Sequence, residues 1–333
     1  MTWIDAPAHR PRTPAPVPRH LAGISVARAR ARALVQRPGP FDDDAVLVRD
    51  TTVRGAAGPL PARTYRPRAG GRGVVLFLHG GGWALGDLDT DDAVCRRIAA
   101  DAGTAVLGLG YRLAPEHPHP AALEDASAVL RALADRGAGG VGGPGEPLAV
   151  AGAEAGAQLA AVLALRSRAG SVPPLAHQVL LCPVLDSDLT RPSHREHGHG
   201  PELTVEDLAW FWRMHVPDRA ARRRPDVSPL RVPDPTGLAP ATLVVAGADP
   251  LRDEGLAHAG RLTAAGVDAH RVLAEDARHG FATRPGSPDA DAALRAVTDR
   301  LRPALAPAAR TAAGARVIDL RAPVRVAGAR SAP

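Results

Sequence analysis

Four short segments of the sequence carry groups that could do chemistry together. In chain order they are residues 79–82 (His-Gly-Gly-Gly), 152–156 (Gly-Ala-Glu-Ala-Gly), 249–255 (Asp-Pro-Leu-Arg-Asp-Glu-Gly) and 279–281 (His-Gly-Phe). Two carboxylates and an imidazole, brought together beside free backbone N–H groups, could move protons and stabilise negative charge on a substrate oxygen.

The glycines of the first two segments predict the backbone geometry of such a site. Gly80, Gly81 and Gly82 allow the backbone to approach a substrate and turn N–H groups toward it, as an oxyanion hole requires. The glycines of residues 152–156 permit a sharp strand-to-helix turn that presents Glu154 at a helix N-terminus. Because a helix N-terminus stabilises an anion, we expect Glu154 to be ionised.

All four segments border stretches that predict buried β-strands. The apolar stretches expected to form strands are residues 74–78, 105–109, 148–151, 178–181, 242–246 and 270–273. Between them apolar residues recur at helical spacing, as at Leu123, Ala126, Leu130 and Leu133. Strands that alternate with helices predict a parallel sheet covered on both faces, with ligands bound at the carboxyl ends of the strands.

The same pattern predicts how the chain is divided. We expect an N-terminal arm or cap over residues 1–45, with a helix over about 20–35, and a catalytic domain over 46–305. An insertion over about 186–238 breaks the alternation and is predicted to form a small helical cap above the strand ends. The Ala- and Arg-rich residues 306–333 are expected to be a flexible tail.

Taken together, the four segments and residues 111–116 (Tyr-Arg-Leu-Ala-Pro-Glu) resemble the hormone-sensitive-lipase-like carboxylesterases. The resemblance runs from about residue 45 to 305 and implies an α/β-hydrolase fold, with a mostly parallel central sheet, helices on both faces and a small helical cap. It further implies that Asp249 orients His279 as the general base. It also implies that the N–H groups of the glycine run and of Ala155 form the oxyanion hole.

The sequence departs from this family at the turn that should carry the nucleophile. The family has Gly-Asp-Ser-Ala-Gly there, whereas this chain has Ala153 and Glu154 in place of the Asp and the Ser. Without a hydroxyl group the acyl-serine intermediate cannot form, and a carboxylate attacking an ester would have to expel a much more basic alkoxide. Ordinary esterase activity is therefore not expected.

Three hypotheses remain open for Glu154. In the first, Glu154 and His279 move protons on a small carbonyl- or ester-containing molecule, giving elimination, dehydration or cyclisation, possible steps of specialised biosynthesis; plant members of the family with a replaced serine are dehydratases. In the second, Glu154 is a covalent nucleophile toward an epoxide or alkyl halide. In the third, the protein is a catalytically dead binding protein or scaffold, and Glu154 fills the oxyanion hole.

Several weaker signals have simpler explanations. Trp83, Trp210 and Phe211 are candidates for a substrate pocket, although aromatic residues at these positions also suit packing of the cap. The His194-x-x-His197-x-His199 pattern lacks a recognised metal-site spacing, so we expect no metal and no other cofactor.

Two pairs of charged residues are given structural or solvent-facing roles. Arg112 and Glu116 are expected to form a structural ion pair, and Glu275 and Asp276 to lie in a solvated loop.

Composition excludes some classes of function. The formal charge is +6, but no lysine is present, the arginines are scattered, and aromatic residues make up only 3%, so we expect no nucleic-acid partner. No apolar run is long enough to span a bilayer, and two cysteines are too few for a disulfide framework, so no membrane association and a cytoplasmic location are expected. The expected partner is a small-molecule substrate, and a homodimer is left open.

Overall fold

The computed structural model describes residues 24–25, 27–28, 45–284 and 286–306 of the 333-residue chain. Most of the predicted arm over 1–45 and of its helix over about 20–35 lies outside these residues, as does the predicted tail over 306–333 apart from Ala306. What is described of the arm is a short helical piece in which Ile24 is buried and Arg28 donates hydrogen bonds to Glu116 and to the backbone oxygens of Ala84 and Ala114.

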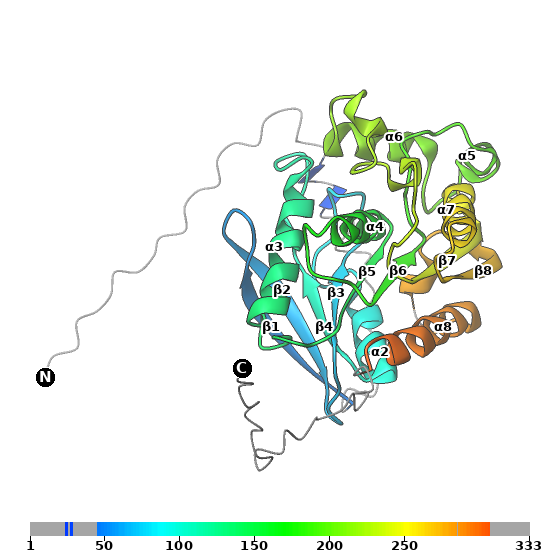
Figure 1. Cartoon of the computed structure of the whole chain (residues 1–333). Helices are drawn as coiled ribbons and strands as arrows, with labels where there is room; N and C mark the ends of the chain where they lie inside the picture. The colour runs from blue at the N-terminus through cyan, green and yellow to red at the C-terminus, as the bar shows by residue number, and fades with distance from the viewer. Residues whose placement is uncertain (1–23, 26, 29–44, 285, 307–333) are drawn as a thin grey trace, which may run out of the picture.

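The described part of the chain is built on one eight-stranded sheet (Figure 1). Its strands in chain order are β1 (Val46–Arg54), β2 (Pro59–Pro67), β3 (Val74–Leu78), β4 (Ala105–Leu109), β5 (Leu148–Ala153), β6 (His177–Leu181), β7 (Ala241–Ala248) and β8 (Ala269–Arg278). Their spatial order is β1-β2-β4-β3-β5-β6-β7-β8, and all neighbours are parallel except β1 with β2 and β2 with β4. The predicted fold class is confirmed.

Helices cover both faces of the sheet. The longer ones are α2 (Asp92–Ala102), α3 (Ala121–Asp135), α4 (Ala155–Arg168), α7 (Arg252–Ala264) and α8 (Pro288–Ala304). Along β3, Val75 and Phe77 pack in a core with α2 and α8, whereas Leu76 and Leu78 pack in a larger core with α3, α4 and α7. Because successive side chains of a strand point to opposite faces, this short apolar strand is buried from both sides.

The segment between β6 and β7 contains short helices rather than a strand. They are α5 (Pro192–His197), α6 (Val205–His215) and the 3-10 turns η2 (Ala221–Arg223) and η3 (Pro229–Arg231). Figure 1 shows α5 and α6 together at one end of the sheet. A further 3-10 turn, η4 (Phe281–Thr283), follows β8. None of the helices in the described ranges has the length and apolarity needed to cross a bilayer.

Two expectations about charged residues are wrong. Arg112 pairs with the fully buried Asp125 at 2.8 Å, and Glu116 pairs with Arg28 at 2.8 Å, so they do not pair with each other. Residues 275–276 are exposed, as expected, but they belong to β8 rather than to a loop, because this edge strand continues to Arg278.

The buried Asp125 gives a first test of the packing. Its carboxylate accepts hydrogen bonds from the Arg112 guanidinium and from the backbone N–H groups of Ala56 and Arg112. We expect Asp125→Ala to lower the free energy of unfolding by roughly 2–4 kcal/mol, because it leaves Arg112 and two amides without their acceptor. Urea titration followed by circular dichroism measures this.

The matched control is Asp299→Ala, which removes a carboxylate that is 68% exposed and pairs with Arg302 on the surface of α8. Exposed pairs of this kind contribute little, so the urea midpoint should hardly move. Equal midpoints for the two variants would show that the Asp125 network does not stabilise the fold.

Candidate active site

Glu154 lies at the tight turn between β5 and α4. Its backbone has φ 52° and ψ −110°, a positive φ that non-glycine residues rarely adopt. A Cβ atom on Gly156 would stand 1.9 Å from the backbone oxygen of Leu78, and one on Gly152 would stand 2.3 Å from Gly156. The two glycines therefore let the turn pass close to the end of β3, and the strained turn projects Glu154 from the end of the sheet.

Three ionisable side chains from three segments form one chain of contacts. Asp249 follows β7 and His279 follows β8. The Nδ1 atom of His279 lies 2.8 Å from Oδ2 of Asp249, and its Nε2 atom lies 3.4 Å from Oε1 of Glu154. The side chains are 1% exposed at Asp249, 8% at His279 and 27% at Glu154, so the chain runs from the interior outward and Glu154 is the member that reaches solvent.

The charges of this chain support one another. Burial alone would lower the pKa of His279, but the negative charges of Asp249 and Glu154 raise it well above its ordinary value. Burial would raise the pKa of Glu154, yet the charge of His279 and hydrogen bonds from His279 and the Gly81 amide lower it. At neutral pH the favoured state is an imidazolium held between two carboxylates.

The glycine run lies directly against Glu154. The Gly81 N–H donates to Oε2 of Glu154 at 3.0 Å, and a Cβ on Gly80 would stand 3.0 Å from the same carboxylate. The Gly80 N–H instead donates to Asp91 at 2.9 Å, so this amide is engaged away from Glu154. Among the glycine amides predicted for an oxyanion hole, that of Gly81 therefore hydrogen-bonds to Glu154. The amide of Gly80 instead stabilises the glycine loop through Asp91.

The other predicted site residues have different surroundings. Ala155 begins α4, so its N–H lies in the first turn, where helical amides have no partner within the helix. Gly82 (φ 59°) abuts the ring of Phe211, which stacks edge-on with Trp210 at 5.1 Å. Trp83 is only 2% exposed and its indole N–H donates to Gln158, so its side chain is packed in the core next to the glycine run.

Sequence reasoning missed the residues that hold the glycine run in place. Asp91 accepts from Gly80, and Tyr111 donates its hydroxyl to the backbone oxygen of His79 at 2.8 Å while its ring stacks on the imidazole at 4.3 Å. Burial raises the pKa of Asp91 to about 7. The sequence signal that could have indicated Asp91 is an acidic residue immediately before an amphipathic helix, downstream of the glycine run.

Two of the three histidines in the predicted motif, which lies between β6 and β7, are close to charged side chains. His194 is buried with its Nε2 3.8 Å from Oε1 of Glu254, and His197 lies 3.1 Å from the Arg252 guanidinium. In the ranges that the structure describes, no three His, Cys, Asp or Glu side chains come together as metal ligands could.

A buried ion chain on the carboxyl ends of β5, β7 and β8, beside a glycine run that follows β3, is the arrangement of an α/β-hydrolase. A family model described as "alpha/beta hydrolase fold" matches residues 75–283. The chain belongs to this family.

Its relatives include several esterases. The chain is 42% identical over 267 residues to the carboxylic ester hydrolase LipN of Mycobacterium tuberculosis, covering 78% of this chain and 70% of that protein. It is 37% identical over 252 residues to the ethyl acetate hydrolase of Pseudomonas putida, covering 73% and 78%. The chain is thus related to carboxylesterases.

Solved structures show the same similarity. A thermostable esterase from Pseudomonas putida ECU1011 superposes with a TM-score of 0.80 at 31% identity, covering 87% of this chain and 93% of that one. The esterase of Pyrobaculum calidifontis superposes with a TM-score of 0.76 at 33% identity, covering 86% and 96%.

The charge state of His279 can be tested directly. Because its folded pKa is raised, its contribution to stability is complete below the unfolded value of about 6.5 and is lost as pH rises through the folded pKa. Glu154→Gln removes one of the two carboxylates, so the NMR titration of the His279 ring should move to lower pH. While His279 is charged, the free energy of unfolding of the wild type should exceed that of Glu154→Gln. This difference should disappear as the pH rises through the folded His279 pKa.

Glu275→Gln is the matched control, because it removes an exposed carboxylate four residues from His279 that makes no contact with it in the described structure. Superimposable His279 titrations in the wild type and Glu154→Gln would contradict the ion chain.

Proposed function

We propose that the protein is an acid–base enzyme derived from the carboxylesterase architecture, in which Glu154 stands where its relatives carry a nucleophilic serine. Its substrate is a small organic molecule with a carbonyl or ester oxygen, and the reaction is an elimination, dehydration or cyclisation of the kind used in biosynthesis. The observation that supports this most is the chain Asp249–His279–Glu154, with contacts of 2.8 and 3.4 Å.

The chain of charges favours proton transfer over acyl transfer. A serine mechanism needs a neutral imidazole that accepts the proton of a hydroxyl, whereas here two carboxylates favour the imidazolium and no hydroxyl faces it at residue 154. An imidazolium is a proton donor, and the neighbouring carboxylate is a proton acceptor. The pair therefore combines a general acid and a general base within 3.4 Å.

A dehydration shows how the protons balance. Glu154 removes a proton from the carbon next to the substrate carbonyl, and His279 donates its Nε2 proton to the hydroxyl group that leaves from the neighbouring carbon. A C–H and a C–O bond break, a C=C bond forms and water departs. Glu154 then returns its proton to His279 across their contact, which restores the starting state. The amide groups beside Glu154 stabilise the enolate oxygen that develops.

One contact favours a second candidate function, a binding protein without catalysis. The Gly81 N–H that should stabilise an oxyanion is occupied by Oε2 of Glu154. If this bond persists when a ligand is bound, the site holds its own anion and performs no reaction. Covalent attack by Glu154 has less support, because both of its oxygens already have partners, His279 and Gly81.

The proposed place of the protein in the cell is the cytoplasm. Cys95 and Cys182 are both buried and form no disulfide, which suits a reducing compartment. The small-molecule substrate and a homodimer remain predictions from the sequence.

A restored nucleophile tests the first part of the proposal. We expect the wild type to hydrolyse p-nitrophenyl butyrate barely above background and Glu154→Ser to hydrolyse it measurably faster. The serine supplies the hydroxyl, frees the Gly81 amide and removes one charge that favours imidazolium. A single substitution is preferable because Ala153, the other departure from the family turn, is packed in the core, and changing it would alter the packing as well as the site.

The control is Glu154→Ser combined with His279→Ala, which should return to background because the serine has lost its base. Wild-type turnover in the range of roughly 1–10³ s⁻¹ would contradict the proposal, since this is the rate of an ordinary enzyme.

A second experiment separates catalysis from binding. Glu154→Gln keeps the size of the side chain but removes the base. The rate at which the native host forms the product should therefore fall by roughly 10²–10⁴-fold. Metabolite profiling of the host carrying this variant measures the loss, with Glu275→Gln as the control. An unchanged profile, with the variant expressed and folded, would leave the binding-protein alternative.

A further inference from the structure

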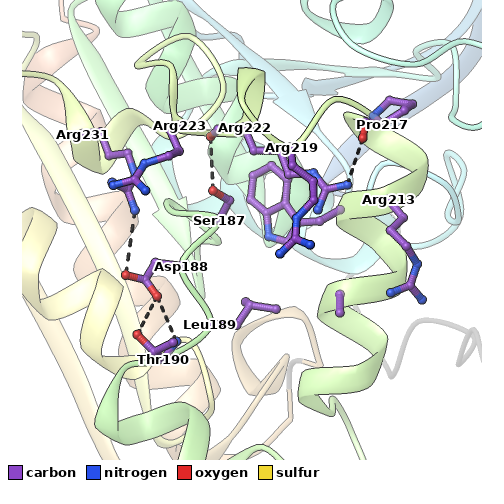
Figure 2. Close-up of a pocket in the computed structure, with 12 residues that line it drawn as sticks. Ser187, Asp188, Leu189, Thr190, Arg213, Pro217, Arg219, Arg222, Arg223 and Arg231 are labelled. Carbon is purple, nitrogen blue, oxygen red and sulfur yellow. Dashed lines mark hydrogen bonds and ion pairs between the residues drawn. The ribbon is translucent and has the colours of Figure 1, made fainter.

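A hollow lies in the segment between β6 and β7, apart from the Glu154 centre. It has a volume of about 720 Å³ and is bordered by residues 187–190 after β6, by α6 and by the segment from Pro217 to η3 (Figure 2). Pockets that hold small molecules have volumes of roughly 300–1,000 Å³, so the hollow has room for one. None of the residues of the ion chain lines it.

The hollow is strongly positive. Five of its lining residues are arginines: Arg213, Arg219, Arg222, Arg223 and Arg231. Asp188 is the one carboxylate among the residues that line it. Figure 2 shows the arginines arranged around one space, with Asp188 and Thr190 at one side of it.

Two of the arginines have structural partners. Arg231 pairs with Asp186 at 2.6 Å and with Asp188 at 3.9 Å. Arg222 donates to the backbone oxygens of Val216 and Pro217. These contacts hold the walls of the hollow in place. They also provide a partner, Arg231, for Asp188, the carboxylate that lines it.

The other three arginines have no such partners. Arg213, Arg219 and Arg223 are exposed, and their side chains make no hydrogen bond or ion pair with the described part of the chain. Burial, together with the charges of Arg219 and Arg213, lowers the pKa of Arg222, as expected where like charges crowd. Asp218 offsets part of this effect at Arg222, but positive charges outnumber the carboxylates around the hollow, and an anion bound there would relieve the remaining repulsion.

The hollow also has an apolar wall. Leu189, Ala209, Pro217 and Trp212 line it, and the Trp212 side chain is almost completely buried. The indole N–H of Trp212 has no hydrogen-bond acceptor within the described structure, which is unusual for a buried donor. The walls therefore offer apolar surface beside guanidinium groups.

We propose that this hollow binds a small organic anion, with its carboxylate, sulfonate or phosphate group on Arg219 and Arg223 and its apolar body against Leu189 and Pro217. A guanidinium forms paired hydrogen bonds with such oxyanions, and a concave site with an apolar wall suits a small molecule better than a polymer.

Helix α6 connects this hollow with the glycine run. Phe211 abuts Gly82, and the ring of the next residue, Trp212, lies 4.6 Å from that of Trp83. One helix therefore forms a wall of the hollow on one side and packs on the glycine run on the other. The anion site is nevertheless defined by its own residues and does not depend on the reaction assigned to Glu154.

The test uses a pair of fluorescent probes that differ in charge. 8-Anilinonaphthalene-1-sulfonate carries a sulfonate on an aromatic body, and N-phenyl-1-naphthylamine is its neutral counterpart. Titrated into the full-length protein at low salt, the sulfonate should bind more tightly, and its affinity should fall as salt is added. Arg219→Gln with Arg223→Gln should weaken sulfonate binding by at least about tenfold, because two charge-assisted contacts are lost, and should leave the neutral probe unaffected.

The matched control is Arg54→Gln with Arg66→Gln, which removes two exposed arginines from the β1–β2 edge of the sheet. It should leave sulfonate binding unchanged, as should Glu154→Gln, so that failure of the anion site and failure of the proposed reaction can be told apart. Equal binding of both probes, or sulfonate binding that survives the Arg219/Arg223 change, would overturn the proposal. Displacement by an oligonucleotide but not by benzoate or pyrophosphate would also overturn it, since the arginines would then form a polyanion surface.

Discussion

The geometry of the candidate site depends on an imidazolium enclosed by two carboxylates. His279 and Asp249 are nearly removed from solvent, and an unpaired charge at either position would be costly. Their 2.8 Å contact makes each tolerable only while the other is present. The Leu251 N–H donates to the second oxygen of Asp249, so the buried carboxylate has a partner on each side. Glu154 then adds a second negative charge at the outer end.

The sheet brings these charges together because its parallel strands end at one edge. β5, β7 and β8 deliver Glu154, Asp249 and His279 there, and β3 delivers the glycine run. The pairing of β7 with β8 shifts register between Ala246 and Ala248, just before Asp249. At Gly247 a Cβ would stand 1.9 Å from the backbone oxygen of Glu275, so the two strands approach there more closely than a side chain allows. This irregularity therefore lies on β7 and β8, the two strands that Asp249 and His279 follow.

The sequence predicts best those features whose signal lies within a short stretch of residues, and it fails for contacts between distant segments. The strands over 74–78 and 105–109 match β3 and β4 to the residue, because they are continuous apolar runs with abrupt ends. β1 and β2 were missed because neither is a continuous apolar run. In the edge strand β1, Leu47 is 47% exposed while its neighbour Val46 is buried, and charged residues interrupt both strands. The partners of Arg112 and Glu116 could not be found because they come from other elements. The motif pointed to Gly80 but could not reveal that its N–H donates to Asp91, which lies eleven residues further along the chain.

The length of the Glu154 side chain decides what the site can still do. A serine hydroxyl at the end of such a turn faces the imidazole and leaves the glycine amides free for a substrate oxygen. The carboxylate reaches further, and one of its oxygens contacts His279 while the other accepts from Gly81. A substrate oxygen that enters must displace Oε2 from Gly81, and an anion that replaces another anion gains only the difference between two similar hydrogen bonds.

A neutral carbonyl gains its hydrogen bond from Gly81 only as negative charge develops on it. The released Glu154 meanwhile becomes a stronger base, because it has lost a hydrogen-bond donor. Displacement of Oε2 would then activate the base at the moment when the amide begins to stabilise the product of its proton abstraction. The contact that blocks the site in the free protein is therefore compatible with catalysis, provided that the side chain can move away from Gly81, and its 27% exposure leaves it one open side toward which to move.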